Sequence, residues 1–285
     1  MPHHRRRLVL TFDAFGTLFT PREPIGQSYA DAARRHGLSG FTNDQIASTF
    51  RDAFKQKQNK APNYGKQVGM GPPQWWSNVI HATFSPFNPS SILPPKLVSD
   101  LLHRFGSSEG YRLYEDVAPM FEELRRAKQL CAVEAAAPEL TIGVITNSDD
   151  RVPSVLSSLG LEVSPRRYGL MVDSLDTHSD MEDDIDFVVM SYDVGDEKPS
   201  RDVFDAAKQL VRFNWGNPEQ KDRFIHIGDD LEKDFEGAER AGWESVLLDR
   251  DGIHKVHGSQ KSRALSVIRN LRELIPYLRI DQQGG

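Results

Sequence analysis

The chain has 285 residues, of which 38% are hydrophobic and 27% are charged, and its formal net charge is −6. This length allows one large or two ordinary domains with a sizeable core. The acidity argues against nonspecific binding to nucleic acid, and no apolar run approaches the ~20 residues that a membrane-spanning helix needs. A lone cysteine, Cys131, cannot form an internal disulfide and is compatible with a reducing compartment. We therefore expect an intracellular protein, cytoplasmic or nuclear, whose oligomeric state the sequence leaves open.

The stretch LVLTFDAFGTLF, residues 8–19, carries the first functional signal. Its continuous apolar run predicts a buried strand over residues 7–13, and this run ends at Asp13 before a turn that contains Gly16 and Thr17. In an open α/β sheet, ligands bind outside the carboxyl ends of the strands. Asp13 is therefore the first candidate nucleophile, although an acid in this place can also simply end a strand or cap the next element.

Helical spacing replaces the strand-like runs between about residues 24 and 107. Apolar residues recur there at intervals of three and four, and clusters of proline and glycine separate the groups. The pattern predicts an all-helical insert of four helices, with these apolar positions: Ile25, Tyr29 and Ala32; Ile46, Phe50 and Phe54; Trp76, Val79, Ile80 and Phe84; Leu97, Leu101 and Phe105.

Strands and helices then alternate to the end of the chain. The pattern predicts strands at 140–145, 187–190, 224–227 and 246–248, and helices at 115–129, 151–161, 201–211 and 234–241. A final amphipathic helix is predicted from Leu265, Ile268, Leu271, Ile275 and Leu278. This alternation predicts an α/β fold with a Rossmann-like, doubly wound parallel sheet. We expect a core domain of residues 1–20 and 112–285 and a helical cap domain of residues 21–111.

Polar residues follow four of the predicted strands. Besides Asp13, they are Thr146 and Asn147 after the second strand, Lys198 after the third, and Asp229 and Asp234 after the fourth. Because carboxylates that converge repel one another, the arrangement implies a divalent cation, Mg²⁺, at Asp13 and Asp229. A phosphoryl group would then lie between the cation, Lys198 and the Thr146 hydroxyl.

This order of motifs resembles the haloacid dehalogenase-like hydrolase superfamily over nearly the whole chain. In that family the aspartate at the end of the first strand is the nucleophile and forms a covalent intermediate, usually an aspartyl-phosphate. By similarity Asp13 takes that role and Thr146 binds phosphate. Lys198 stabilises the nucleophile and the phosphoryl group, Asp229 is the direct metal ligand, and Asp234 in GDDLEKD is the second motif acid. The resemblance implies Mg²⁺ as cofactor and a small phosphorylated molecule as substrate.

The chain departs from most phosphatases of this superfamily at Phe15, where they carry a second aspartate as general acid and base. Phenylalanine cannot transfer a proton, but its backbone carbonyl can still bind the metal, so we expect Mg²⁺ binding to survive the change. Loss of a general acid costs ~10² to 10⁴ in rate. We therefore expect a phosphatase that is slow, or restricted to activated phosphates. Its substrate is expected to contact Thr17, Thr146, Asn147 and Lys198.

Two other functions stay open. The opening DAFGTLF also resembles 2-haloacid dehalogenases, in which an aromatic residue stands at this place and halide leaves without a proton. A catalytically retired protein of the same fold, which binds a metabolite or a protein partner, is the other alternative. Within the fourth strand, His226 is expected to be a packed core histidine rather than a base. The acidic stretch 173–184 lacks the glycine of a calcium loop and is expected to be a solvated loop.

Overall fold

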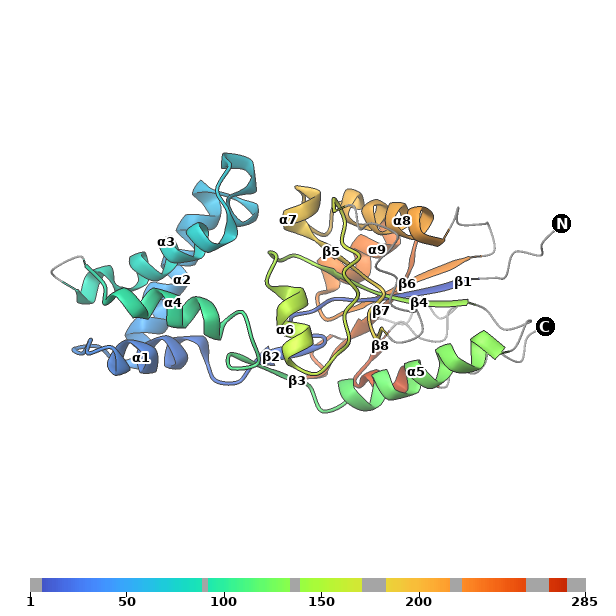
Figure 1. Cartoon of the computed structure of the whole chain (residues 1–285), viewed down its shortest axis with the longest axis horizontal. Coiled ribbons are helices and arrows are strands. Elements are labelled where there is room, and N and C mark those ends of the chain that lie inside the picture. The colour runs from blue at the N-terminus through green and yellow to red at the C-terminus, as the bar shows by residue number, and fades with distance from the viewer. Residues whose placement is uncertain are drawn as a thin grey trace. The chain divides into compact units, whose positions relative to one another are not determined.

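The computed structural model describes residues 7–88, 92–133, 139–170, 183–215, 222–254 and 267–275 (Figure 1). The chain divides into two compact units. The first consists of residues 1–20, 113–147 and 161–285, and the second of residues 21–112 and 148–160. The core and cap boundaries given by the sequence stay a prediction, and the structure groups Ser148–Gly160 with the second unit.

A parallel sheet forms the centre of the first unit. Its strands are β1 (Arg7–Phe12), β4 (Glu139–Thr146), β5 (Phe187–Met190), β6 (Arg223–Gly228), β7 (Glu244–Leu248) and β8 (Val267–Ile268). Its helices are α5 (Val117–Val133), α7 (Ser191–Val194), α8 (Arg201–Trp215) and α9 (Gly237–Arg240). The strand order is β5-β4-β1-β6-β7-β8, and each neighbouring pair is parallel. Figure 1 shows α8 and α9 over one face of the sheet and α5 over the other, so the predicted doubly wound sheet is confirmed.

Strand β1 is buried along its whole length because both faces of the sheet are covered. Val9 belongs to the apolar cluster that contains Val203 and Phe204 of α8. On the opposite face, Phe12 packs against Phe121 of α5, with 5.9 Å between the ring centroids. The continuous apolar run in this part of the sequence therefore follows from a strand that has no solvent-facing side.

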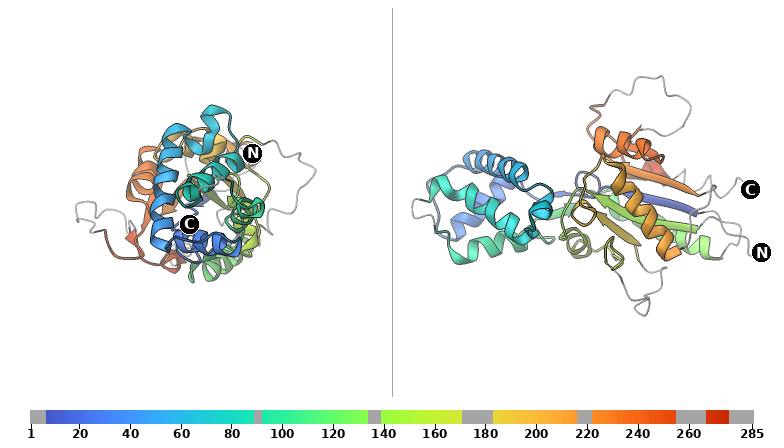
Figure 2. Two further views of the ribbon diagram at one scale, coloured as in Figure 1. Left: turned by 90° about the vertical axis from the view of Figure 1, so that its left-hand side faces the viewer. Right: turned by 90° about the horizontal axis from the view of Figure 1, so that it is seen from above.

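The carboxyl ends of three strands lie side by side at the middle of the sheet. Phe12, the last residue of β1, pairs with Val144 of β4 on one side and with Ile227 of β6 on the other. The right-hand view of Figure 2 shows β1 in blue between β4 in green and β6 in orange. The residues that follow these strands are consequently brought together beyond the carboxyl ends of the strands, which is where open α/β sheets bind ligands.

The second unit is mainly helical, as predicted. Its helices are α1 (Ile25–Arg35), α2 (Asn43–Lys60), α3 (Pro72–Phe84), α4 (Pro95–Arg104) and α6 (Val152–Ser158), with 3-10 helices η1 (Asn63–Val68) and η2 (Ser85–Phe87). Helix α2 begins with a capping box, in which Thr42 and Gln45 each bond the other's backbone N–H. Trp75 of α3 is fully buried and donates its ring N–H to the carbonyl of Ala61 at 2.8 Å.

The predicted final helix is wrong at its start. Val267–Ile268 forms the edge strand β8, which pairs with Leu247 and Leu248 of β7. The 3-10 helix η4 (Leu271–Leu274) follows it, and Asn270 caps this helix. Pairing with the edge of the sheet buries Ile268, which outweighs the helical spacing of the apolar residues. Leu265 and Leu278 of the predicted helix lie outside the described residues.

Two further differences concern short elements. The helix predicted at 234–241 is a π-helical turn, η3 (Leu231–Glu236), followed by α9. The sequence pattern also missed a two-stranded sheet of β2 (Phe19–Pro21) and β3 (Tyr111–Leu113), whose strands are too short to give a periodic signal.

No helix within the described ranges combines the length and the apolar character that crossing a membrane requires. The acidic stretch predicted to be a loop, 173–184, falls outside the described residues except for Asp183 and Asp184.

Candidate active site

Asp13, the candidate nucleophile, directly follows the central strand of the sheet. Its backbone N–H donates to the carbonyl of Ile227 at 2.8 Å and so extends the pairing of β1 with β6 by one residue. The residue is 8% exposed, and its Oδ1 accepts a hydrogen bond of 2.7 Å from the Lys198 ammonium. The backbone and the side chain of Asp13 are therefore both held in place.

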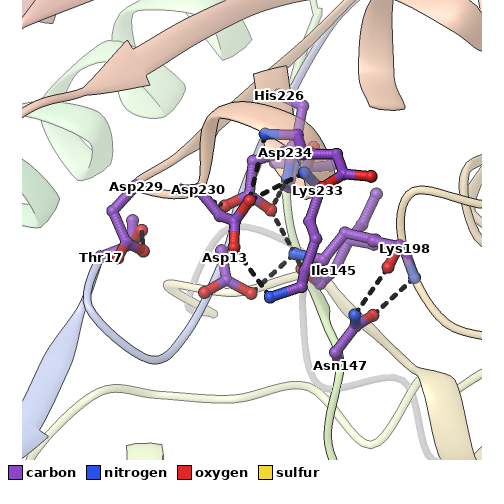
Figure 3. A network of polar contacts seen from close by, with 12 residues as sticks. Asp13, Thr17, Ile145, Asn147, Lys198, His226, Asp229, Asp230, Lys233 and Asp234 are labelled. Carbon is purple, nitrogen blue, oxygen red and sulfur yellow. Dashed lines mark hydrogen bonds and ion pairs between the residues drawn. The ribbon is translucent and has the colours of Figure 1, made fainter. Parts of the chain in front are cut away.

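Lys198 is the centre of the polar network in Figure 3. Its ammonium donates to Asp13 Oδ1 at 2.7 Å, to Asp234 Oδ1 at 2.6 Å and to the carbonyl of Ile145 at 2.7 Å. An ammonium group has three N–H donors, so each has a partner in this arrangement. The lysine consequently links the candidate nucleophile to one of the two later acids.

Asn147 brings the loop of Lys198 to the end of β4. Its side-chain oxygen accepts the backbone N–H of Lys198 at 2.7 Å, and its amide nitrogen donates to the carbonyl of Lys198 at 2.9 Å. This paired contact fixes the peptide from which the lysine side chain reaches the site. Thr146, the last residue of β4, is 1% exposed and precedes this asparagine directly.

Asp229 lies against the turn that follows Asp13. The Thr17 hydroxyl donates to Asp229 Oδ1 at 3.0 Å. Gly16 has φ +78°, and a Cβ at this position would lie 2.2 Å from Asp229 Oδ2. Glycine is therefore required here both by the backbone conformation and by the close approach of the carboxylate.

Asp234 folds back onto the end of β6. Its Oδ2 accepts the backbone N–H of Asp230 at 3.0 Å, and a Cβ on Gly228 would lie 2.2 Å from the same oxygen. Asp234 does not cap the helix that follows β6, because Asp230 takes that role and accepts the N–H groups of Glu232 and Lys233. Asp234 is thereby left to bond Lys198.

His226 contributes to the site although it is buried in the core. Its Nε2 lies 3.2 Å from Asp234 Oδ1, and its Nδ1 lies 2.9 Å from the Thr11 hydroxyl. Because an ionised carboxylate only accepts hydrogen bonds, we assign the ring proton to Nε2, which donates a hydrogen bond to Asp234. Burial lowers the pKa of His226, which keeps the imidazole neutral. The sequence missed this contact, since a histidine inside an apolar strand gives no signal of what it touches.

The cluster holds three carboxylates and one ammonium, and this imbalance shifts their pKa values. Burial, together with Asp234 and Asp229, raises the pKa of Asp13 to about 7 in spite of Lys198. Burial and the charge of Asp234 also raise the pKa of Asp229. Burial alone would raise the pKa of Asp234, but Lys198 and His226 lower it. Of the two acids bonded to Lys198, Asp13 is thus the one that binds a proton more readily.

The donor set fits a divalent cation. Carboxylate oxygens of Asp13, Asp229 and Asp234 all lie within 4.8 Å of one another. Mg²⁺ is bound in proteins through carboxylate, carbonyl and water oxygens. Phe15 is 40% exposed, and its ring packs edge-on against Phe19 with 4.6 Å between the ring centroids. The ring brings no charge to the cluster. A dication would therefore relieve the excess of negative charge without a competing side chain at that position.

We expect Lys198→Met to destabilise the metal-free protein by about 3–5 kcal/mol, because it leaves two buried carboxylates without their cation. Urea denaturation in the presence of a chelator measures the effect. Lys128→Met is a matched control, because Lys128 is also buried and bonds Asp186 at 2.8 Å. Both variants should lose stability, but only Lys198→Met should change the affinity for Mg²⁺. Equal Mg²⁺ affinity of the two variants would contradict the role given to Lys198.

The raised pKa of Asp13 predicts how stability depends on pH without metal. The folded protein binds a proton on Asp13 up to about pH 7, whereas the unfolded chain releases it near 3.8. The free energy of unfolding should therefore fall as the pH rises through this window. Asp13→Asn should reduce the dependence of the unfolding free energy on pH. Part of this dependence should remain, because the pKa of Asp229 is also raised. A slope unchanged by Asp13→Asn in urea titrations with chelator would contradict the assignment.

Together, the fold and the cluster define a Rossmann-like α/β protein with a charged site at the carboxyl ends of its central strands. The family model for haloacid dehalogenase-like hydrolases matches residues 8–242. The chain belongs to this family.

One relative and two solved structures illustrate the likeness. Haloacid dehalogenase-like hydrolase domain-containing protein 3 of Mus musculus is 26% identical over 288 residues, covering 98% of this chain and 96% of the mouse protein. A 2-haloacid dehalogenase from Pseudomonas syringae has a TM-score of 0.56 at 19% identity, covering 97% of this chain and 99% of its own. A phosphatase of the family from Thermococcus onnurineus has a TM-score of 0.53 at 20% identity, covering 95% and 97%. The fold is therefore common to a dehalogenase and a phosphatase and does not choose between them.

Proposed function

We propose that the chain is a Mg²⁺-dependent hydrolase of a small phosphorylated molecule and acts through an aspartyl-phosphate on Asp13. The observation that carries the proposal is the convergence of three carboxylates within 4.8 Å of one another, with a single buried lysine bonded to two of them. Displacement of a halide from a carbon atom has no use for a second and third acid. Phosphoryl transfer does, because its charge is neutralised by a metal ion.

In the proposed reaction the Asp13 carboxylate attacks phosphorus. The new bond joins its oxygen to phosphorus, and the bond from phosphorus to the leaving-group oxygen breaks and gives that oxygen the electron pair. Lys198 holds the nucleophile in one orientation through its bond to Oδ1. The substrate-binding groups in this proposal are Lys198, Asn147 and the hydroxyls of Thr17 and Thr146.

A different set of groups would hold the metal: the carboxylates of Asp13, Asp229 and Asp234 with the backbone carbonyl of Phe15. When bound, Mg²⁺ supplies positive charge that offsets the phosphoryl oxygens and favours ionised Asp13. This effect on ionisation matters because only the carboxylate form of Asp13 can attack. Without metal, its pKa of about 7 would leave part of the nucleophile protonated at neutral pH.

The absence of a proton-transferring side chain at Phe15 affects both halves of the reaction. In the first half an alkyl leaving group needs a proton, whereas the leaving group of an acyl phosphate or phosphoanhydride is already a weak base. In the second half water attacks the phosphorus of aspartyl-phosphate, the bond from phosphorus to the Asp13 oxygen breaks and restores the carboxylate, and the proton of the water must pass to solvent. We therefore propose activated phosphates as the favoured substrates, with hydrolysis of the intermediate as the slow step.

A 2-haloacid dehalogenase is the second candidate, since an aromatic residue at position 15 suits a halide that leaves without protonation. The fold shared with the enzyme from Pseudomonas syringae is compatible with it. A retired binding protein is the third, and the retention of a nucleophile beside a metal-binding donor set speaks against it.

A screen of phosphorylated metabolites, with acetyl phosphate and p-nitrophenyl phosphate as activated references, separates the three. Phosphate release that requires Mg²⁺ supports the proposal. Chloride release from 2-chloropropionate in the presence of a chelator would replace it with the dehalogenase, and binding without turnover of any substrate would favour the retired protein.

A further inference from the structure

Arg250, two residues after the end of β7, bonds the two segments next to the points at which the chain first leaves the first unit and first returns to it. The chain passes into the second unit after Thr20 and returns at residue 113. We infer that Arg250 is a positioning residue: its guanidinium fixes the turn at Gly16 and Thr17, and through this turn it aligns Asp229 for metal binding.

Arg250 reaches both segments with one planar group. Nη2 donates to the carbonyl of Thr17 at 2.8 Å, and Nε lies 3.4 Å from the carbonyl of Gly16. On the other side, Nη1 donates to Asp116 Oδ2 at 2.8 Å. The guanidinium also stacks on Tyr114, with 4.0 Å from Cζ to the ring centroid. Only a guanidinium offers this planar fork of donors, so a lysine could not make the same set of bonds.

The contacts of Arg250 are more sheltered than those of a surface ion pair. The side chain of Arg250 is 18% exposed and that of Asp116 is 4% exposed. Asp116 Oδ2 also accepts the backbone N–H of Leu271 at 2.8 Å, and the N–H of Tyr114 donates to the carbonyl of Leu18 at 3.1 Å. Exposed pairs contribute little to stability, whereas a half-buried and multiply bonded arginine restricts the groups that it touches.

The turn that Arg250 holds is the one that contacts Asp229. The carbonyl bonded to Nη2 belongs to Thr17, whose hydroxyl donates to Asp229 Oδ1 at 3.0 Å. Gly16, at φ +78°, lies so close to Asp229 that there is no room for a Cβ. A small displacement of this turn would therefore change the position of the Asp229 carboxylate directly.

The test measures hydrogen exchange by mass spectrometry on the whole metal-free protein, comparing Arg250→Met and Arg250→Lys with the wild type. Arg223→Met is the matched control, because Arg223 forms a forked pair with Glu244 at 2.9 Å on neighbouring strands. We expect Arg250→Met to raise exchange about 10-fold or more in peptides covering 14–20 and 113–117, where the backbone loses its tie. Arg223→Met should leave these peptides unchanged.

The second measurement is the affinity for Mg²⁺ alone, by calorimetry. Loss of a group that orients a metal ligand typically costs ~10–100-fold in affinity, and we expect this for Arg250→Met. This part rests on the proposed metal site, whereas the exchange measurement does not, so failure of the one is distinguishable from failure of the other. If Arg250→Met does not fold, the exchange of Arg250→Lys tests the inference instead, because this variant keeps the positive charge and loses the planar set of donors. Wild-type exchange of both peptides in Arg250→Lys would overturn the inference.

Discussion

Asp13→Asn is expected to abolish Mg²⁺-dependent hydrolysis of acetyl phosphate, with a fall of at least about 10³-fold in kcat, because the amide cannot form the aspartyl-phosphate. The substitution keeps the shape of the side chain and its place after β1. The result is measured as phosphate release in the presence of Mg²⁺, beside circular dichroism to show that the variant is folded.

Asp186→Asn is the matched control for this experiment. Asp186 is also a buried aspartate in the first unit, and its Oδ1 is paired with Lys128 at 2.8 Å. Its other oxygen accepts the backbone N–H of Ile142 at 2.7 Å, and it is not among the residues assigned to the candidate site, so its folded variant should keep the metal-dependent rate. Equal activity of Asp13→Asn and wild type would rule out the covalent mechanism.

Phe15→Asp is expected to raise the turnover of an alkyl phosphate by about 10² to 10⁴, the usual contribution of general acid and base catalysis. Phe15 is 40% exposed, so an aspartate there would be accessible to solvent. For acetyl phosphate a rise in turnover is also expected, because the attack of water on the intermediate is the proposed slow step, whereas formation of the intermediate should stay as fast as in the wild type.

Phe15→Asn separates proton transfer from the removal of a bulky ring. It gives nearly the same shape as Phe15→Asp and cannot act as an acid or base. We expect Phe15→Asn to stay as slow as the wild type on alkyl phosphates. Equal gains for the two variants would mean that the ring obstructs the substrate and that a missing proton donor is not the bottleneck.

The parts of the site that the sequence predicts are those in which a polar residue directly follows an apolar strand. Asp13 follows β1, Thr146 ends β4 and Asp229 follows β6, and parallel pairing brings these strand ends together. Lys198 belongs to a longer loop, but its conjunction with three acids in one order made it a candidate. Residues of this kind can be predicted from the sequence because each one is adjacent in the chain to the strand that positions it.

The contacts that the sequence could not predict depend on register and on distant parts of the chain. His226 meets Asp234 because η3 turns back onto β6, and nothing in the strand FIHI indicates that return. Arg250 meets Thr17 across 233 positions in the chain. The edge strand β8 was missed for a similar reason, since its two residues, Val267 and Ile268, fit a helical spacing and are committed to a strand only by pairing with β7.

The most direct test of the covalent mechanism is to look for a phosphoryl group on Asp13 during turnover. The wild-type protein is mixed with acetyl phosphate and Mg²⁺, quenched in acid within the first turnover, digested and mapped by mass spectrometry. We predict a phosphoryl adduct on the peptide that contains Asp13, at higher occupancy than in Phe15→Asp, where water attack is faster. Release of phosphate with no adduct on Asp13 at any quench time would contradict the mechanism.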